Sequence, residues 1–391
     1  MQDNNCDIVI IGGGPVGMAL ALALRDSNLT TLLLEARGLP EKVDDERPLA
    51  LSHGSYLILQ RLEVWGKLLR HNTPIKTIHI SNKGFLGRTV LTTEDAGVSA
   101  LGYVVNYHDL YHALYDATLE NGILYQVGAD VKAFSTDQLS SHVQYTHEGT
   151  EKNISAKLLV LADGGRLSSQ IADIDFKTEA YDQWAIVANV KAEIPQSGIA
   201  YERFTSDGPV ALLPSGNDFA LVWTTSLEMA NEILALDEER FLYRLHKHFG
   251  DRLGRFVAAG KRAGFPLALK YAVPPTSQRI ALIGNAAQTL HPVAGQGFNL
   301  GLRDAYELAQ ISLATVADNK EIGSPAMLAR YGQLRRTDSQ GGRIFTDSLI
   351  KLFSNDNTLL RHLCGVGLTI LDNCPPIKRF VSRRMIFGAR G

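Results

Sequence analysis

The stretch DIVIIGGGPVG, residues 7–17, decides how this chain begins to fold. Asp7 to Ile11 form a short apolar run that predicts a buried strand, and the glycines end it. MALALALRD, residues 18–26, predicts an alanine-rich helix, and TTLLLEA, residues 30–36, predicts a second strand. The order strand, glycine turn, helix, strand indicates the start of a βαβ unit.

The glycines of this turn, Gly12, Gly14 and Gly17, have the spacing G-x-G-x-x-G. The first permits the tight turn, the second lets the backbone approach a pyrophosphate, and the third lets helix and strand pack closely. Glu35 ends the next strand at the spacing of a ribose ligand. The pattern favours a nucleotide site over a plain βαβ turn, and does not separate NAD from FAD. The expected contacts are Gly12, Gly14, Pro15, Gly17, Glu35, Ala36 and Arg37.

A second glycine-rich stretch, GNAAQTLHPVAGQGFNLG, residues 284–301, follows the apolar run RIALI. A chain that binds only NAD does not need it, whereas the ribityl chain and ring of a flavin need a cradle of their own. Backbone at Gly284 can approach the ribityl chain, and Asn285 can hydrogen-bond a hydroxyl. The helix expected from Asn299 directs its positive end at the charge of a reduced flavin. The second set of expected contacts is Gly284, Asn285, Gly295, Gln296, Gly297, Phe298 and Asn299.

The composition excludes several other classes of protein. The chain has 391 residues, 45% of them hydrophobic, and a formal net charge of −2, so we expect a globular protein without a nucleic-acid partner. Its three cysteines, Cys6, Cys364 and Cys374, have no metal-ligand spacing, which predicts a reducing compartment and no metal site. The sequence shows neither a signal peptide nor a run of ~20 apolar residues, so a cytoplasmic location is expected.

The pattern changes at residues 180–225, where strand-like runs are separated by Gly, Pro and Asp turns without helices between them. We therefore expect a mostly antiparallel sheet inserted between α/β segments. The predicted fold class is α/β. It comprises a discontinuous Rossmann-type FAD domain (1–72, 102–178 and 272–340), a β-rich substrate domain (73–101 and 179–271) and a C-terminal helical segment (341–391).

Three motifs carry a resemblance to a known family. GGGPVG, ADGG at 162–165 and the 284–301 stretch resemble the motifs of class A FAD-dependent aromatic hydroxylases, typified by p-hydroxybenzoate hydroxylase. YERFTSDGPVALLP, residues 201–214, and RAGFPLAL, residues 262–269, are similar to the ubiquinone-biosynthesis hydroxylases, above all the 2-polyprenyl-6-methoxyphenol hydroxylase type. The resemblance implies a p-hydroxybenzoate-hydroxylase-like fold.

The resemblance also implies further cofactor contacts. Arg47 resembles the family arginine near the FAD pyrophosphate, and Asp163 and Gly164 match the DG motif. Two departures lie in the second flavin motif, where Asn285 and Gln288 stand at positions that usually hold Asp and His. Leu167 and Gln170 stand where the DG motif often continues with Ser and Arg, so nicotinamide contacts are not carried over to this segment.

The chemistry that the resemblance implies is hydroxylation of the phenol ring of a polyprenylated ubiquinone precursor. FAD is the cofactor, O2 the co-substrate and NAD(P)H the expected reductant, and oxygen is transferred from a flavin hydroperoxide. His291 and Pro292 are the candidate catalytic residues, with a purely conformational His-Pro pair as the alternative. The candidate substrate residues are Tyr201, Arg203, Phe204, Pro214 and Pro266.

Other functions remain open at this stage. They are hydroxylation at another ring position, a flavin oxidase or dehydrogenase on another substrate, and a non-catalytic member of a biosynthetic complex. A flavin halogenase is disfavoured, because Trp65, Trp184 and Trp223 do not form its W-x-W-x-I-P signature.

The C-terminus has two interpretations. IKRFVSRRMIFGAR, residues 377–390, interleaves basic with bulky apolar residues, and LCGVGLTIL, residues 363–371, is apolar but short. Such a segment suits the inner face of an anionic membrane, where a substrate with a long tail resides, or a partner in a ubiquinone-biosynthesis complex. The alternative is that Phe380, Ile386 and Phe387 pack on the FAD domain while the arginines stay solvated.

Overall fold

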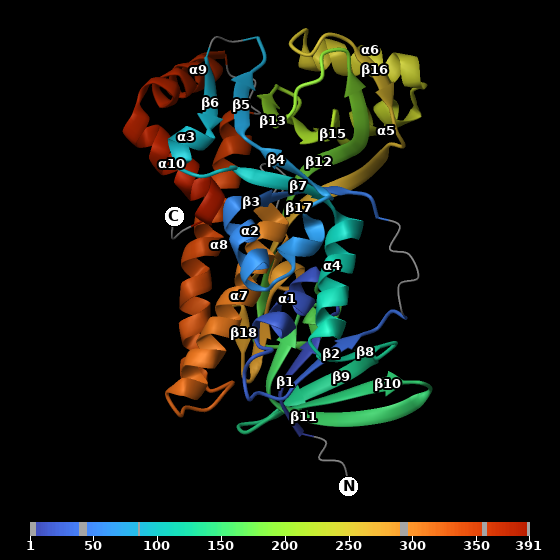
Figure 1. Ribbon diagram of the computed structural model, residues 1–391, viewed down its shortest axis with the longest axis vertical. Coiled ribbons are helices and arrows are strands. Elements are labelled where there is room, and N and C mark those ends of the chain that lie inside the picture. Colours follow the sequence, from blue (N-terminus) through green and yellow to red (C-terminus); the bar gives the residue numbers. More distant parts are fainter. Residues whose placement is uncertain (1–4, 39–44, 85–86, 290–295, 354–357, 389–391) are drawn as a thin grey trace.

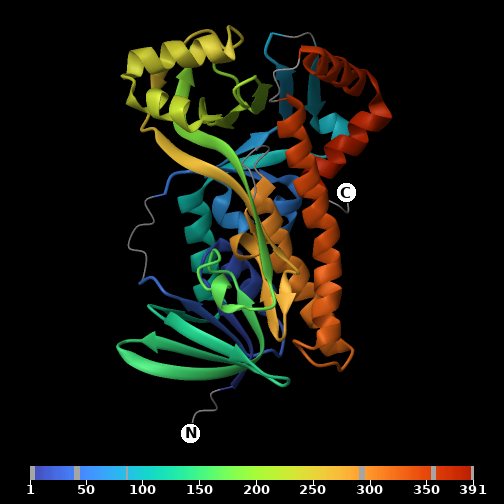
Figure 2. The same ribbon diagram turned by 180° about the vertical axis from the view of Figure 1, so that it is seen from behind.

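The computed structural model describes residues 5–38, 45–84, 87–289, 296–353 and 358–388. The molecule is elongated, with one large sheet towards each end and a small third sheet between them (Figure 1). Two long strands, β12 (Asp175–Ala192) and β17 (Ala263–Val273), pair with each other and run between the two ends (Figure 2).

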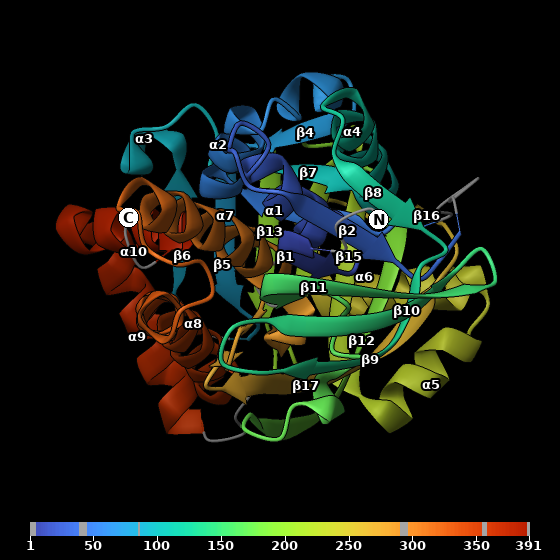
Figure 3. The same cartoon turned by 90° about the horizontal axis from the view of Figure 1, so that it is seen from below.

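The first sheet is built around β1 (Asn5–Ile11), the strand predicted from the opening stretch. It has the order β18-β19-β11-β1-β2-β8, and β1 runs parallel to both of its neighbours. Figure 3 shows β11 between β1 and the antiparallel pair β10–β9. The other strands are β2 (Thr31–Glu35), β8 (Leu124–Val127), β9 (Asp130–Thr136), β10 (Ser141–His147), β11 (Thr150–Leu161), β18 (Thr276–Ser277) and β19 (Ile280–Leu282).

Both faces of this sheet are covered, which explains the unbroken apolar run in β1. Ile8 and Ile10 belong to a core beneath the helices, whereas Val9 and Ile11 belong to a second core on the opposite face. The helices that contribute to the first core include α1 (Pro15–Ala23), α2 (His53–Arg61), α4 (Tyr107–Glu120), α7 (Gln296–Ala317) and the start of α8 (Pro325–Phe353). Helix α2 ends at Arg61, because Glu63 adopts a left-handed φ of 64°, and the short 3-10 helix η1 (Trp65–Leu68) follows.

The second sheet has the order β20-β17-β12-β15-β14-β13-β5-β6, and β16 pairs with β12. One face packs on α5 (Leu227–Ala235) and α6 (Glu238–Phe249), with Phe219, Leu221, Trp223 and Phe241 in the core between them. The strands not yet given are β5 (Thr77–Asn82), β6 (Arg88–Thr92), β13 (Ile199–Phe204), β14 (Val210–Ser215), β15 (Asp218–Ser226), β16 (Phe256–Ala259) and β20 (Gln288–Thr289). The mostly antiparallel sheet predicted from residues 180–225 is confirmed.

Between the two large sheets lies the three-stranded sheet β3-β7-β4. Its strands are β3 (Pro48–Ser52), β4 (Asn72–Ile75) and β7 (Gly102–Asn106), and the short helix α3 (Thr93–Ala96) precedes β7. Two further 3-10 turns, η2 (Ser168–Gln170) and η3 (Gly284–Ala286), follow β11 and β19. The mixed α/β architecture is the one expected from the sequence.

The C-terminal helices return to the second sheet. Helix α8 (Pro325–Phe353) runs along the molecule, so the proposed division at residue 340 falls inside a continuous helix (Figure 1). Helix α9 (Thr358–Asn373) packs on β5 and β6, and α10 (Pro375–Phe387) packs on α2 and α3. Among the helices that the structure describes, none is long and apolar enough to cross a membrane.

A buried ion cluster joins α7, α8 and the loop after β19. Arg335 Nε lies 2.6 Å from Asp304 Oδ1, and Arg335 Nη1 lies 3.1 Å from Glu307 Oε2 and 3.0 Å from Asp338 Oδ2. The side chains of Arg335 and Asp304 are only 3% and 2% exposed. Burial raises the pKa of Asp304 to about 6, although the Arg335 guanidinium opposes this shift. Asp304 Oδ2 also accepts the Gly284 N–H at 2.9 Å, so the cluster holds the second glycine loop in place.

We expect Arg335→Leu to lower the free energy of unfolding by about 3–5 kcal/mol, because it leaves buried carboxylates without their cation. The matched control is Lys67→Ala, which breaks the more exposed 2.6 Å pair with Glu120 and should cost less than about 1 kcal/mol. Urea unfolding of the two variants checks this. Equal losses of unfolding free energy in Arg335→Leu and Lys67→Ala would show that the buried cluster contributes no more than an exposed ion pair.

Candidate active site

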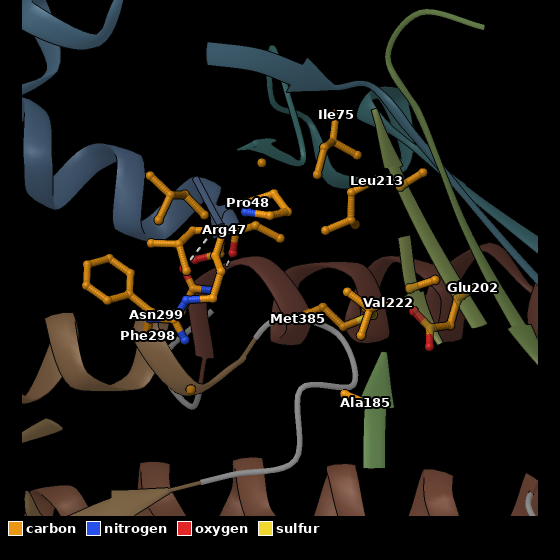
Figure 4. Close-up of a pocket in the computed structure, with 18 of the residues that line it drawn as sticks. Arg47, Pro48, Ile75, Ala185, Glu202, Leu213, Val222, Phe298, Asn299 and Met385 are labelled. Carbon is orange, nitrogen blue, oxygen red and sulfur yellow. Dashed lines mark hydrogen bonds between the residues drawn. The ribbon is translucent and has the colours of Figure 1, made fainter. Parts of the chain in front are cut away.

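A cavity of about 690 Å³ lies where the two glycine loops, the inner face of the second sheet and the C-terminal helices meet. Its lining is mostly apolar and joins segments from residue 14 to residue 386. Figure 4 shows Arg47, Phe298 and Asn299 on one side of it and strand residues such as Glu202 and Val222 on the other.

The first glycine loop is shaped by two close contacts and one open position. A Cβ on Gly17 would collide with the carbonyl oxygen of Gly12, and a Cβ on Gly12 would collide with the carbonyl of Ala162. Gly14 lines the cavity and has nothing within 4 Å of the place a Cβ would occupy. Gly12 and Gly17 therefore allow tight packing, whereas Gly14 leaves room for a ligand at the start of α1.

Glu35 lies at the end of β2, and its carboxylate is already oriented. Oε2 accepts the Gly13 N–H at 2.7 Å, and Oε1 accepts the Arg37 N–H at 2.9 Å. Ala36 and Arg37 follow as exposed residues. Each carboxylate oxygen keeps further accepting capacity, which suits the ribose ligand predicted from the sequence.

The second glycine loop also combines glycines in close backbone contact with a glycine that faces open space. Gly284 has a left-handed φ of 59°, and a Cβ on Gly301 would lie 3.0 Å from the Gly284 Cα. Asn285 is exposed and lines the cavity, and Gly297 has nothing within 4 Å of a Cβ position. Helix α7 begins at Gln296, three residues before the expected start. His291, Pro292 and Gly295 lie outside the described residues.

Two of the expected cofactor contacts use their side chains within the protein. Asn299 is 1% exposed, and its Oδ1 accepts from Ser52 N at 2.8 Å and Ser55 Oγ at 2.6 Å, while its Nδ2 donates to Ala50 O at 2.8 Å. Asp163 accepts the N–H groups of Gly165 and Leu167. These two side chains hold the loops in shape. Gly164, with a φ of 73°, is the part of the DG motif that lines the cavity.

Arg47 is placed at the cavity by Asp45. Its Nε and Nη2 donate to the Asp45 carboxylate at 2.8 and 2.7 Å, and its guanidinium lies 5.5 Å from the centre of the Tyr107 ring. Both Arg47 and Tyr107 line the cavity. The cation is therefore preorganised beside the first glycine loop, where a pyrophosphate would lie.

These residues fit a flavin dinucleotide. Gly14 and Gly297 leave open space at two helix N-termini, Glu35 supplies a carboxylate, and Arg47 supplies a cation. The helix ends and the cation suit phosphates and a reduced ring, and the apolar remainder suits a flat aromatic body.

Of the candidate substrate residues on β13 (Ile199–Phe204), Tyr201 and Phe204 line the cavity, and Arg203 does not. Side chains alternate along β13, so Glu202 and Phe204 face the cavity, whereas Arg203 points towards Gly250 after α6. Tyr201 borders the cavity, but its ring packs against Phe219 and Phe249 in the core under α6. Its hydroxyl donates to Gln196 Oε1.

The same one-residue shift occurs on two other strands. Pro214 of β14 is buried away from the cavity, and its neighbour Leu213 lines it. Pro266 of β17 is exposed to solvent, while Phe265 and Leu267 on either side of it line the cavity. A period-two pattern does not show which face of a sheet will be covered by helices.

Glu202 is a candidate functional residue that the sequence did not reveal. It and Arg47 are the two charged side chains among the described residues that line the cavity. Burial raises the pKa of Glu202 to about 7. Side chains alternate along β13, which places Ala200, Glu202 and Phe204 on one face of the sheet. This alternation is the sequence signal that could have identified Glu202.

The C-terminal helices form the remaining wall. Leu368 and Leu371 of α9 and Val381, Met385 and Ile386 of α10 line the cavity. Leu368 packs on Phe204, and Ile386 is buried in a cluster with Ile75 and Leu101. Nothing in the sequence pattern connected these helices with the site.

A βαβ core with two glycine loops that open on one apolar cavity defines a flavin-dependent enzyme. The family described as FAD binding domain matches residues 5–341, and the protein belongs to this family. FAD as the cofactor, predicted from the two loops, is thereby confirmed.

Relatives over nearly the full chain support the hydroxylase class. The chain is 33% identical over 399 residues to ubiquinone hydroxylase UbiL of Rhodospirillum rubrum, covering 97% of this chain and 89% of the relative. It is 29% identical over 388 residues to the 3-demethoxyubiquinol 3-hydroxylase of Escherichia coli, covering 97% and 98%. The prediction of an FAD-dependent hydroxylase is confirmed by this family and these relatives.

A solved structure supports the fold. The p-nitrophenol 4-monooxygenase PnpA from Pseudomonas putida superposes with a TM-score of 0.79 at 15% sequence identity, covering 99% of this chain and all of that one. The predicted p-hydroxybenzoate-hydroxylase-like architecture is confirmed.

Gly14→Ala and Gly17→Ala form a matched pair of tests. Gly14→Ala should leave the fold intact and weaken FAD binding, because its methyl group occupies space at the cavity. Gly17→Ala should lose both FAD and stability, because its Cβ collides with backbone. Flavin content and unfolding midpoints of the apoproteins check this. A Gly14→Ala protein that retains FAD with unchanged affinity would contradict the assignment of this loop.

Proposed function

We propose that this protein hydroxylates the phenol ring of a polyprenylated ubiquinone precursor, using FAD, O2 and NAD(P)H as reductant. The observation that carries the proposal is the cavity, which extends from the glycine loops across an apolar sheet face to two C-terminal helices. The roles of individual residues given below belong to this proposal.

In this proposal, the chain binds and shields the reacting groups. Gly14, Glu35 and Arg47 hold the dinucleotide end of FAD, while Asn285 and the backbone at Gly297 contact its ribityl and ring end. Bound FAD activates O2 for transfer to the ring. The apolar walls exclude water and keep the phenol in one orientation. His291 and Pro292 stay candidate catalytic residues.

The apolar lining also suits an isoprenoid tail. Each buried CH₂ contributes about 0.8 kcal/mol, so the first isoprene units would add substantially to affinity. The two relatives above bear names that refer to ubiquinone and demethoxyubiquinol hydroxylation. The 2-polyprenyl-6-methoxyphenol type remains our preferred substrate, with another ring position of the same pathway as the alternative.

The test is incubation of the FAD-loaded protein with NADH or NADPH, ¹⁸O₂ and 2-farnesyl-6-methoxyphenol. We expect a product that carries one ¹⁸O atom on the ring, detected by mass spectrometry. Hydrogen peroxide without a hydroxylated product from any ubiquinone precursor would favour the oxidase alternative. The precursor that accumulates in a strain lacking the protein identifies the ring position.

The outer side of the C-terminal helices is the part proposed to meet the membrane. Leu363, Val366 and Ile370 recur on one side of α9, and α10, which packs against α9, adds the exposed Ile377 and Phe380. All five side chains are exposed, Phe380 by 67%. We call these five residues the C-terminal apolar face. The inner side of the same two helices lines the cavity, so a tail held in a bilayer would have a short path to the ring.

Charge favours an anionic bilayer as the occupant of this face. Arg379 and Arg383 are exposed on α10, and between residues 358 and 388 the sequence holds five Arg or Lys residues and one acid, Asp372. Basic residues beside bulky apolar ones are drawn to anionic headgroups. The two interpretations of this segment were membrane contact and packing on the protein. Ile386 and Phe387 pack on the protein, because Ile386 is buried against the third sheet and the Phe387 ring contacts His53. Phe380 remains available to a membrane.

The membrane prediction is tested by substitution, because removing α10 would also open the cavity. Val366→Ser, Ile370→Ser and Phe380→Ser together should weaken flotation with phosphatidylglycerol-containing vesicles at least about tenfold, through lost apolar contact. FAD content and turnover of a short-tailed phenol should not change. The control exchanges three exposed leucines elsewhere, Leu124, Leu139 and Leu227, for serine. Undiminished flotation of the first variant would refute the membrane face.

A further inference from the structure

Among the described residues, one carboxyl group interrupts the apolar sheet face of the cavity. Glu202 sits on β13 between Ile80 of β5 and Ala211 of β14, its register partners. Figure 4 shows its carboxylate directed into the cavity beside Val222 and Ala185, across from Arg47, Phe298 and Asn299. The ring of a substrate placed between the glycine loops and the sheet would therefore meet this carboxylate.

The surroundings of Glu202 contain no described partner for its charge. The cavity-facing residues are Ile78 and Ile80 on β5, Ala211 and Leu213 on β14, Val222 on β15, Ala185 and Val187 on β12, Leu368 on α9 and Met385 on α10. None of these side chains titrates. Arg203, the next residue, points towards α6, and Arg47 is paired with Asp45. No group of the described residues donates a hydrogen bond to the Glu202 carboxylate.

A carboxyl group in such a place costs stability, because desolvation disfavours its charged form. An apolar residue would pack at this position at lower cost, as Ala200 and Phe204 do on the same strand. Burial alone raises the pKa of Glu202 to about 7. Titratable groups whose pKa is shifted by desolvation inside a cavity are typical of functional sites.

We propose that Glu202 accepts the proton of the substrate's phenolic hydroxyl. In this step the phenolic O–H bond breaks, an O–H bond forms on the Glu202 carboxylate, and the electron pair stays on the phenolic oxygen. No oxidation or reduction accompanies the transfer. The inference rests on the proposed function, since it assigns the residue that prepares the ring for hydroxylation.

Removal of the phenolic proton activates the ring for hydroxylation. A free phenol has a pKa of about 10, so it is almost entirely protonated near neutral pH. Loss of the proton makes the ortho and para carbons more electron-rich and better able to accept an electrophilic oxygen atom. A base whose pKa lies near the working pH is the most effective general base, and typically contributes about 10²–10⁴-fold in rate.

The test compares Glu202→Gln and Glu202→Asp with the wild-type holoenzyme, using 2-allyl-6-methoxyphenol as a short-tailed probe. Glu202→Gln retains size and a hydrogen-bond acceptor but not the base, so kcat should fall by about 100-fold or more while KM changes little. Glu202→Asp should keep part of the rate. The control is Glu179→Gln, which alters an exposed carboxylate on β12 of the same sheet and should behave as wild type.

The pH profile separates a base from a packing residue. The ionised carboxylate is the active form, so wild-type kcat/KM should rise with pH through about 7 and then level off. Glu202→Gln should lack this rise. The rate of Glu202→Gln should instead recover as the pH approaches about 10, because the phenolate then forms without the base. The same recovery should occur with a fluorinated analogue that is already ionised at neutral pH.

Each result has a distinct meaning. An unchanged rate and pH profile in Glu202→Gln would overturn the inference, and the activity of the wild type would leave the proposed function standing. A loss of rate that is equal at every pH and for both phenols would overturn it as well, since a packing defect behaves in that way. A wild-type holoenzyme that hydroxylates no phenol would instead refute the proposed function.

Discussion

The buried pair of Asp304 and Arg335 connects the parts of the molecule that must act together. Asp304 holds the backbone of Gly284, and Arg335 holds Asp304 from α8. Asp338, one helical turn after Arg335, pairs with Arg303 of α7 at 2.8 Å. Through these contacts, the second glycine loop and the long helix α8, which leads to the cavity wall, share one rigid support. Buried charges of this kind tolerate little rearrangement, because each displaced partner leaves another charge unpaired.

The glycines around the cavity serve two opposite purposes. Gly12, Gly17 and Gly301 lie where backbone touches backbone, so any side chain would force the elements apart. Gly14 and Gly297 face open space, so a side chain would fit the protein and instead occupy the place of a ligand. A single sequence motif therefore combines residues that build the fold with residues that keep a site open, and only the neighbours of each glycine distinguish them.

The cavity belongs to no single domain. Its floor comes from the two glycine loops, its facing wall from the second sheet and its side from α9 and α10. The two sides of α9 and α10 differ accordingly. Leu368 and Met385 face the cavity, whereas Val366 and Phe380 face outward. A long lipophilic substrate suits this arrangement, because its ring and its tail require different surroundings within one continuous apolar space.

The sequence by itself determined the βαβ start, both glycine loops and the strand-rich insert, because glycine spacing and apolar periodicity express local backbone and packing needs. Its candidate substrate residues fall on β13, β14 and β17, three strands that line the cavity. Only the tertiary structure decided which face of those strands meets the cavity, because helices α5 and α6 cover one side and leave Glu202 on the other. The Asp304–Arg335 pair and the cavity wall from α9 and α10 likewise join residues distant in sequence, and no local pattern records such contacts.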